Sequence, residues 1–214
     1  FSRRSLMELF NNPPPFLDTG ETCGGFDFAA GGDENVFAAG HGNRFFIADH
    51  WADPDTVGAR GRFRRKAAEL GIPADRIFAD GDGLGLPLID DFRAEGFPVH
   101  SYRGGFPADD TQAFVNLRAQ AWRALARAIE EKELILDIDE DTIEQLVAPR
   151  FQTDAIGRVK IESKEDMAKR GVRSPDRADA LVMAWHARRH SGLVRELGAW
   201  YARHPAQKRA IGRY

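Results

Sequence analysis

Hydrophobic residues in the first quarter of the chain fall into three short runs. The runs cover residues 22–30, 35–42 and 43–51, and glycine-rich or polar turns separate them. Runs of this length, bounded by turn residues, are typical of β-strands. The pattern therefore predicts three consecutive antiparallel strands.

After these runs the spacing alternates between strand-like and helix-like. The pattern predicts strands over 76–80 and 97–102, a hairpin over 150–163, and helices over 54–71, 84–96, 110–132, 139–147 and from Ser174 to about residue 190. A strand meander followed by alternating strands and helices indicates a mixed α/β sheet with helices on both faces.

Composition narrows the class of protein. The 214 residues are 43% hydrophobic and 29% charged, with a net charge of −3, which is an ordinary globular balance and gives no hint of a nucleic-acid partner. The single cysteine, Cys23, excludes an internal disulfide and a thiolate zinc site. No apolar stretch is long enough to predict a membrane span.

An aspartate stands inside the first predicted strand, where a carboxylate is costly. Asp27 lies between Phe26 and Phe28, and strand alternation puts it on the opposite sheet face from both rings. A buried carboxylate is unfavourable unless it is hydrogen-bonded, paired or bound to a metal. A structural role, with backbone amides bound to Asp27, and a metal-binding role both stay open.

A second aspartate ends the predicted strand 76–80. Asp80 begins the stretch Asp80-Gly81-Asp82-Gly83-Leu84-Gly85. Ligands of α/β sheets bind beyond the carboxyl ends of parallel strands. The stretch does not match the dinucleotide-binding fingerprint, and Asp-Gly is also common in plain turns.

Two further aspartates lie in the first turn of the last predicted helix. Ser174 is a typical N-cap, and the helix dipole alone explains Asp176. Asp179 precedes the apolar run 180–185 and shares a helix face with Asp176. Two like charges on a partly buried face repel each other unless a cation lies between them, which favours metal binding.

Oxygen donors from three separate elements suit Mg²⁺ or Mn²⁺. Paired divalent ions held by carboxylates serve phosphoryl chemistry.

Trp122 and Trp185 are predicted as core residues, and His186 as an ordinary helix histidine.

Four segments, in order, are GFDFAAGGDENVF, FADGDGLGLPLIDDFRAEG, FVNLRAQAWRALARAI and VKIESKEDMAKRGVRSPDRADALVMAW. They resemble the C-terminal nuclease domain of the large terminase subunit of tailed bacteriophages, a family with a ribonuclease H-like fold. The last segment is the most specific. The resemblance implies an endonuclease that cuts double-stranded viral DNA in the host cytoplasm during genome packaging, for headful or end-generating cleavage. It also implies two-metal phosphodiester hydrolysis with two Mg²⁺ or Mn²⁺ ions.

Carried over residue by residue, the resemblance implies three catalytic metal ligands: Asp27, Asp80 and Asp179. Asp176 matches an auxiliary metal position, and Asp33 matches a further acidic position seen in some members. Asp82 competes with Asp80 for the second position, but the spacing to the following glycines favours Asp80.

Whole terminase large subunits begin with an ATPase domain, whereas this chain contains no G-x-x-x-x-G-K-[ST] motif. The resemblance therefore implies that residues 1–15 are a linker or the end of that ATPase domain. It assigns residues 16–195 to the nuclease domain and 196–214 to a basic C-terminal tail. The implied partners are double-stranded DNA, the ATPase domain of the same polypeptide, the portal protein and the terminase small subunit, with no membrane.

Charge is segregated along the chain. Residues 58–66 hold five basic residues and no acid, residues 129–144 hold eight acids and one lysine, and basic residues again outnumber acids over 150–190. We expect DNA phosphates to contact the basic segments 58–66 and 158–173. The alternative is that these segments are solvated helix faces. The candidate contacts are Arg62, Arg64, Arg65, Lys160, Lys164, Lys169, Arg170 and Arg173.

Three other functions stay open on the sequence. Another ribonuclease H-like nuclease, such as a junction resolvase or an integrase-like enzyme, would share the carboxylates. An actin-like or sugar-kinase-like ATP-binding domain would explain the glycine-rich segment GFDFAAGGDE, but normally needs about twice this length. A non-catalytic DNA or portal docking module would use the basic tail.

Overall fold

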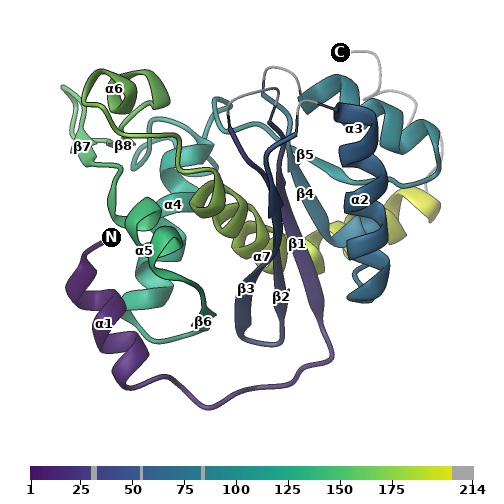
Figure 1. Ribbon diagram of the computed structural model, residues 1–214, viewed down its shortest axis with the longest axis horizontal. Helices are drawn as coiled ribbons and strands as arrows, with labels where there is room; N and C mark the ends of the chain where they lie inside the picture. The colour runs from purple at the N-terminus through teal and green to yellow at the C-terminus, as the bar shows by residue number, and fades with distance from the viewer. Residues whose placement is uncertain (30–32, 54, 83–84, 204–214) are drawn as a thin grey trace.

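The computed structural model describes residues 1–29, 33–53, 55–82 and 85–203, with side chains as far as residue 190. A six-stranded mixed sheet forms its centre, in the strand order β5-β4-β1-β2-β3-β6 (Figure 1). The elements in chain order are α1 (Arg3–Asn11), β1 (Thr22–Asp27), β2 (Asn35–His41), β3 (Arg44–Trp51), α2 (Thr56–Glu69), a 3₁₀ turn (Ala74–Arg76), β4 (Ile77–Asp80), α3 (Gly85–Ala94), β5 (His100–Tyr102), α4 (Leu117–Glu130), β6 (Ile135–Asp137), α5 (Glu140–Val147), β7 (Phe151–Thr153), β8 (Val159–Ile161), α6 (Lys164–Lys169) and α7 (Asp176–Arg203).

The sheet has the predicted mixture of strand directions. β1, β2 and β3 form an antiparallel meander, while β4 lies parallel to β1, β5 to β4 and β6 to β3. The mixed α/β fold predicted from the sequence is therefore confirmed. The short edge strand β6 was not predicted, because three residues are too few to show a strand period.

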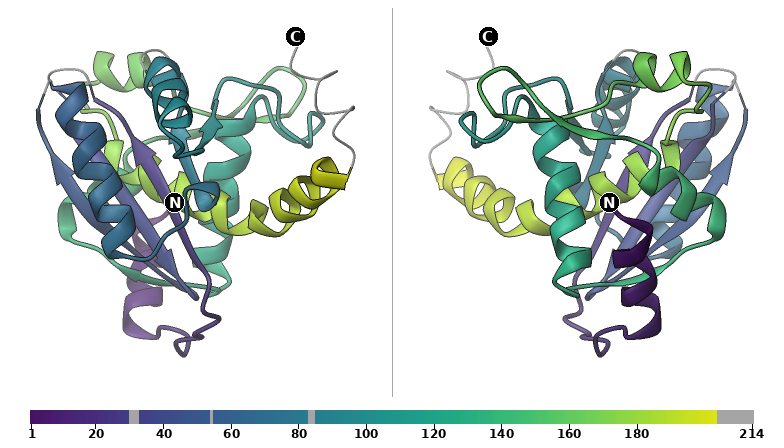
Figure 2. Two further views of the ribbon diagram at one scale, coloured as in Figure 1. Left: turned by 90° about the vertical axis from the view of Figure 1, so that its right-hand side faces the viewer. Right: turned by 90° about the vertical axis from the view of Figure 1, so that its left-hand side faces the viewer.

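Helices cover both faces of the sheet (Figure 2). On one face Phe26 of β1 packs against Phe63 of α2, with ring centroids 4.0 Å apart, and Phe92 of α3 joins this cluster. On the other face α4 and α7 supply a second cluster that contains Trp122 and Leu181. The alternation of β1 therefore turns Asp27 away from the phenylalanine cluster and toward α7.

Helix α7 packs unusually close to β1. A Cβ added at Gly25 would lie 2.1 Å from the carbonyl oxygen of Ala180 and 2.4 Å from the amide nitrogen of Ala184. The thiol of Cys23, on the same face of β1, donates to the same helix at the Ala184 carbonyl. This glycine-dependent contact brings the end of β1 and the first turns of α7 together.

The segment 1–15, predicted as a linker or the end of a preceding domain, contains a helix in the structure. Ser2 caps α1, and Leu6 and Leu9 are buried in the same cluster as α4 and α7. Arg3 also forms ion pairs with Glu140 and Glu144 of α5. That residues 1–15 are a linker or the end of an ATPase domain stays a prediction.

Two helix boundaries differ from the sequence prediction. The helix expected over 110–132 begins only at Leu117, because the Asn116 side chain caps the amide of Ala119 and Asp110 closes a local turn over residues 112–113. The last helix continues to Arg203 rather than ending near residue 190. The predicted tail 196–214 therefore begins as helix backbone, and residues 204–214, like Leu84, lie outside the described residues.

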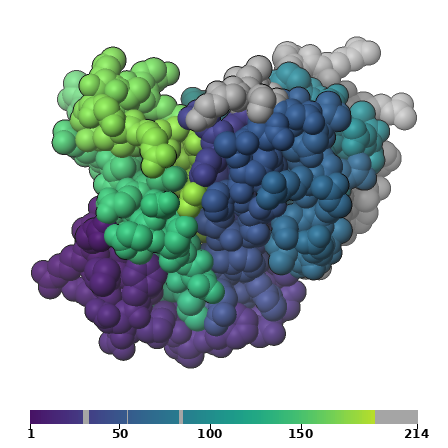
Figure 3. Space-filling model, viewed as in Figure 1, coloured from purple at the N-terminus to yellow at the C-terminus, as the bar shows by residue number. Residues whose placement is uncertain are grey.

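The β7–β8 hairpin and α6 form a lobe beside the sheet, at the upper left of the molecule (Figure 3). Val159 of β8 connects this lobe to the body through a bridge with Phe114, just before α4. Ser163 caps α6, so the chain turns at the end of the hairpin and Lys164 begins the helix. No helix in the described part of the chain is both long and apolar enough to cross a membrane.

Candidate active site

Two carboxylates lie side by side where parallel strands end. β1 and β4 pair in parallel up to Phe26 and Ala79, and Asp27 and Asp80 are the next residue of each strand. Asp27 is buried, with only 2% of its surface exposed, and the Asp80 carboxylate accepts from the amide of Asp82. This is the strand-end position at which α/β sheets bind ligands.

Asp179 faces the same point from α7. Its Oδ1 accepts a 2.8 Å hydrogen bond from the Trp122 indole and a 3.3 Å hydrogen bond from Arg118. Both donors belong to α4, so the orientation of this carboxylate depends on helix–helix packing. Trp122 is a core residue, as predicted, but its polar edge contacts the site.

Asp176 lies one helical turn before Asp179 and is also held by specific donors. The hydroxyl of Ser174 contacts its Oδ1, and the backbone amide of Glu34 donates to its Oδ2 at 3.2 Å. Glu34 is itself fixed by two hydrogen bonds from the buried Arg177. The loop after β1 is thereby tied to the first turn of α7.

Lys164 lies among these carboxylates. Its ammonium is 3.6 Å from Asp27 Oδ2, 3.6 Å from Asp176 Oδ1 and 3.5 Å from Asp179 Oδ2. The sequence analysis predicted Lys164 as a DNA phosphate contact, whereas in the structure it contacts the carboxylates. The α6 N-terminus places it there, and 43% of its side chain is exposed.

Burial and charge shift the acid strengths of this group in different directions. Burial raises the pKa of Asp27 well above its usual value, and the neighbouring carboxylates add to that effect while Lys164 opposes it. Burial likewise raises the pKa of Asp80 and Asp176. Burial also disfavours the charge on Asp179, but Arg118 and Lys164 outweigh it and lower the pKa. The Lys164 pKa is raised, because the surrounding carboxylates outweigh its desolvation.

The donor set fits a divalent metal ion in its chemistry. Asp27 Oδ2 and Asp179 Oδ2 are buried and accept no hydrogen bond, so two oxygens that prefer a cation lack a full partner. All four carboxylates are the hard oxygen ligands that Mg²⁺ and Mn²⁺ favour. Within the described ranges, no three acidic, histidine or cysteine side chains are close enough together to share one ion, and the Lys164 ammonium lies between the carboxylates.

A cleft of about 410 Å³ opens beside the carboxylates. Asp80 of β4 and Asp179 of α7 line it, together with Arg118 of α4 and with Ser163 and Lys164 at the start of α6. The Tyr102 hydroxyl, in the same cleft, is buried without a hydrogen-bond partner. The cleft therefore brings acidic and basic side chains together beside a buried hydroxyl that has no hydrogen-bond partner within the described residues.

The other predicted acids lie at the edge of this arrangement. Asp33 is exposed near Asp176 and lines a neighbouring cavity with it. Asp82 is exposed, with its carboxylate directed to the Gly105 amide at 3.4 Å and to Arg103 at 3.8 Å. Of the two candidates for the second strand-end acid, Asp80 is therefore the one beside Asp27.

The predicted DNA contacts near α6 differ in how free their charges are. Lys169 is paired with Asp166, and Arg170 forms two hydrogen bonds with the buried Glu162. Lys160 and Arg173 are exposed and form no ion pair within the described residues. Arg170 thus holds the lobe together, while Lys160 and Arg173 keep their charges available.

The arginines of α2 lie on the opposite face of the sheet from α7. Arg62 forms two 2.7 Å hydrogen bonds with Asp49, and Arg64 pairs with Glu95 of α3. Arg65 is exposed and has no ion pair in the part of the chain that the structure describes. DNA contact through this segment stays a prediction, and two of its three arginines are already neutralised.

Sequence reasoning missed the residues that hold the acids in place. Arg118 and Trp122 of α4 both bond the Asp179 carboxylate, and Arg177 of α7 bonds Glu34 beside the site. A signal was present for Arg177, which lies between Asp176 and Asp179 in the most specific segment. Nothing in the spacing connects α4 with α7.

The chain matches no family model. It is 32% identical over 118 residues to a protein described as a probable large terminase subunit of Enterobacteria phage P7; the match spans 53% of this chain and 24% of that protein.

Solved structures show the same fold. A manganese-containing nuclease domain of the large terminase subunit of bacterial virus Sf6 superposes with a TM-score of 0.71, at 22% identity, over 87% of this chain and 97% of that domain. The large terminase nuclease of thermophilic phage G20c, in a magnesium-bound form, gives a TM-score of 0.54 at 16% identity over 77% of this chain and 80% of that one. The resemblance predicted from the four segments is therefore confirmed at the level of the fold, which is that of the ribonuclease H-like terminase nucleases.

Proposed function

We propose that this domain is a metal-dependent endonuclease that cuts double-stranded DNA during packaging of a phage genome. The observation that carries the proposal is that Asp27, Asp176 and Asp179 surround Lys164 beside an open cleft that Asp80 also lines, with two buried carboxylate oxygens that accept no hydrogen bond. The manganese and magnesium in the similar terminase nucleases support the choice of cofactor.

Asp27, Asp80 and Asp179 would hold the ions, with Asp176 as an auxiliary ligand and Asp33 as an outer acid. Two such ions supply an acidified water and neutralise charge on the phosphate. No general-base side chain is then required. The proposed cut is headful or end-generating.

The protein's own residues prepare the carboxylates for this role. Arg118 and Trp122 direct Oδ1 of Asp179 toward α4, which leaves Oδ2 facing Asp27 and Lys164. Ser174 and the amide of Glu34 fix Asp176 in the same way. Oriented ligands of this kind raise affinity for a cation because little side-chain freedom is lost on binding.

Cations around the cleft would position the DNA backbone. Lys160 and Arg173 are exposed and form no ion pair within the described residues, and Arg118 lines the cleft itself. Contacts to phosphates are sequence-independent, so we expect cleavage without strong base preference. The ATPase domain, portal protein and terminase small subunit belong to this proposal as partners of the longer polypeptide, in the host cytoplasm.

Plasmid cleavage tests the proposal. With Mn²⁺ or Mg²⁺ the wild-type chain should convert supercoiled plasmid to linear product, and chelation should abolish this. Asp27→Asn and Asp179→Asn should each lower the rate by at least about 100-fold. Asp90→Asn, which changes an exposed carboxylate on α3, is the matched control. Full activity of either site variant would overturn the assignment, and faster cutting of branched DNA than of linear duplex would favour a junction resolvase instead.

A further inference from the structure

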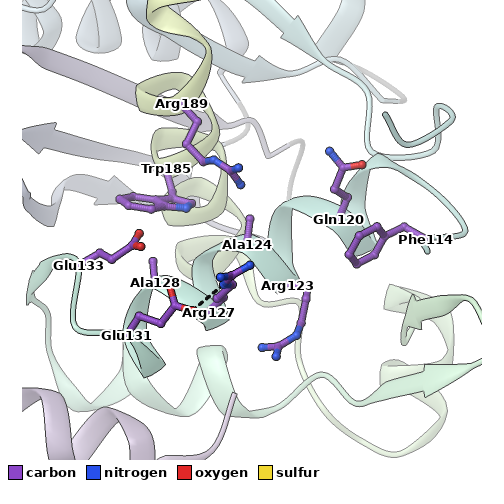
Figure 4. A pocket seen from close by; sticks show the side chains of 10 residues that line it. All are labelled: Phe114, Gln120, Arg123, Ala124, Arg127, Ala128, Glu131, Glu133, Trp185 and Arg189. Carbon is purple, nitrogen blue, oxygen red and sulfur yellow. Dashed lines mark hydrogen bonds and ion pairs between the residues drawn. The ribbon is translucent and has the colours of Figure 1, made fainter. Parts of the chain in front are cut away.

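A second cavity, of about 520 Å³, lies between α4 and α7 and shares no lining residue with the carboxylate cleft (Figure 4). Its charged lining residues are Arg123, Arg127, Glu131, Glu133 and Arg189, and its aromatic ones are Phe114 and Trp185. Nothing in the proposed nuclease chemistry uses these residues. The cavity therefore calls for its own explanation.

Trp185 gives the first indication of a ligand. Its side chain is only 7% exposed, and its indole nitrogen is buried with no hydrogen-bond partner within the described residues. A buried N–H donor that lacks an acceptor destabilises the folded state. Figure 4 shows the nitrogen edge of the ring turned toward the α4 side chains that line the cavity. A hydrogen-bond acceptor bound in the cavity would satisfy the indole N–H of Trp185.

The arginines give an independent indication. Arg189 projects into the cavity from α7, one turn beyond Trp185, and forms no ion pair within the described part of the chain (Figure 4). Arg123 and Arg127 each bond a single glutamate, at 3.0 and 2.7 Å, so further guanidinium N–H groups are free. An anionic acceptor would satisfy the indole and pair with Arg189 together.

We propose that this cavity binds a peptide segment of a partner protein through one acidic side chain. The carboxylate would accept from the Trp185 indole and pair with Arg189. The exposed Glu131 and Glu133 also line the cavity and would repel the successive phosphates of a nucleic acid. A single carboxylate meets less of that repulsion than a row of phosphates does, and the apolar surface of Ala124 and Ala128 suits the side chains that flank it.

Selection from a random library of 12-residue peptides, displayed against the whole 214-residue chain, provides the probe. We expect the enriched peptides to share one aspartate or glutamate at a fixed position. The best peptide should bind Arg189→Gln at least 10-fold more weakly and Trp185→Phe at least 5-fold more weakly than the wild type. Arg188→Gln, the same charge change at the preceding residue, which does not line the cavity, should bind like the wild type.

Three results would overturn the proposal: no enriched peptide, enriched peptides without a common acid, or equal affinity for wild type and Arg189→Gln. The indole resonance of Trp185, assigned with Trp185→Phe, separates the ligand classes by NMR. Inorganic phosphate or a 12-base-pair duplex that shifts this resonance at lower concentration than the peptide would overturn the peptide assignment. Because Arg189 is exposed, its variant keeps the test intact even if Trp185→Phe fails to fold.

Discussion

The indole nitrogen of Trp122 donates a 2.8 Å hydrogen bond to Asp179, so a fully buried core residue of α4 orients a carboxylate on α7. The same carboxylate oxygen also accepts from Arg118. The geometry of the candidate active site therefore depends on how α4 packs against α7. A substitution in the core should therefore affect cleavage as well as stability.

Trp122→Phe tests this connection. The substitution removes the donor but keeps an aromatic ring, so we expect a loss of about 1–3 kcal/mol in the free energy of unfolding. We also expect a drop of about 10-fold in the rate of plasmid cleavage, with more Mn²⁺ needed for half-maximal rate. Trp51→Phe, in the cluster on the other sheet face, is the control. Equal cleavage by the two variants would show that the hydrogen bond does not orient Asp179.

Lys164→Met tests whether the lysine ammonium neutralises the carboxylates when no metal ion is bound. The substitution removes the ammonium that lies 3.5 to 3.6 Å from Asp27, Asp176 and Asp179, so without metal these carboxylates lose the cation between them. We expect a loss of about 1–2 kcal/mol in unfolding free energy in EDTA, a figure reduced for the partial exposure of Lys164.

Addition of Mg²⁺ should then raise the melting temperature of Lys164→Met more than that of wild type, because an ion that binds only the folded state stabilises it. Lys169→Met, whose lysine is exposed and pairs with Asp166, is the matched control. An identical Mg²⁺ response in the wild type and Lys164→Met would contradict this role.

The combined variant Lys160→Ala and Arg173→Ala tests the proposed DNA path. Both residues are exposed and have no ion-pair partner in the part of the chain that the structure describes, so their loss should weaken duplex binding and reduce the slope of log K against log[salt] by about 2. The comparison is Arg62→Ala with Arg64→Ala, which removes equal charge from residues already bonded to Asp49 and Glu95. A larger loss in the α2 variant would place the DNA on the opposite face of the sheet.

His186 predicts a pH dependence of stability. The residue is 8% exposed, and burial lowers its pKa to about 3, with His190 adding to the effect. The unfolded chain binds a proton near pH 6.5 while the folded chain does not, so stability contributed by His186 is present above that pH and is lost as the pH falls.

Between pH 7 and pH 5 this loss amounts to about 2 kcal/mol. His186→Phe keeps a ring against Phe78 and Tyr102 but cannot take up a proton. The variant should therefore lack this part of the pH dependence in urea unfolding. Parallel pH curves for the two proteins would show that His186 is protonated in the folded state as readily as in the unfolded one.

The sequence predicted the mixed α/β fold, because the fold depends largely on local patterns. The strand meander and the apolar start of the last helix are visible as spacing, and Asp27 is conspicuous in an apolar strand. The structure then brings Asp27 and Asp179 to the same lysine. What could not be predicted depends on contacts between distant elements.

Lys164 and Trp122 illustrate that limit. A lysine in a basic segment predicts a phosphate contact, and only the hairpin and the capped α6 turn it toward the carboxylates. A tryptophan in an apolar helix predicts core, and its polar edge matters only because α7 crosses there. Likewise, the prolines after residue 12 suggest a spacer, although Leu6 and Leu9 belong to the core.

The central claim is that Asp27, Asp80 and Asp179 together hold the divalent ions that cut DNA. Anomalous diffraction from crystals soaked in Mn²⁺ tests it most directly, with Asp179→Asn crystals as the comparison. We predict the strongest anomalous peak within coordination distance of Asp27 and a second acid of this set, and its loss or weakening in Asp179→Asn. Well-ordered carboxylates with no peak among them at millimolar Mn²⁺ would contradict the account.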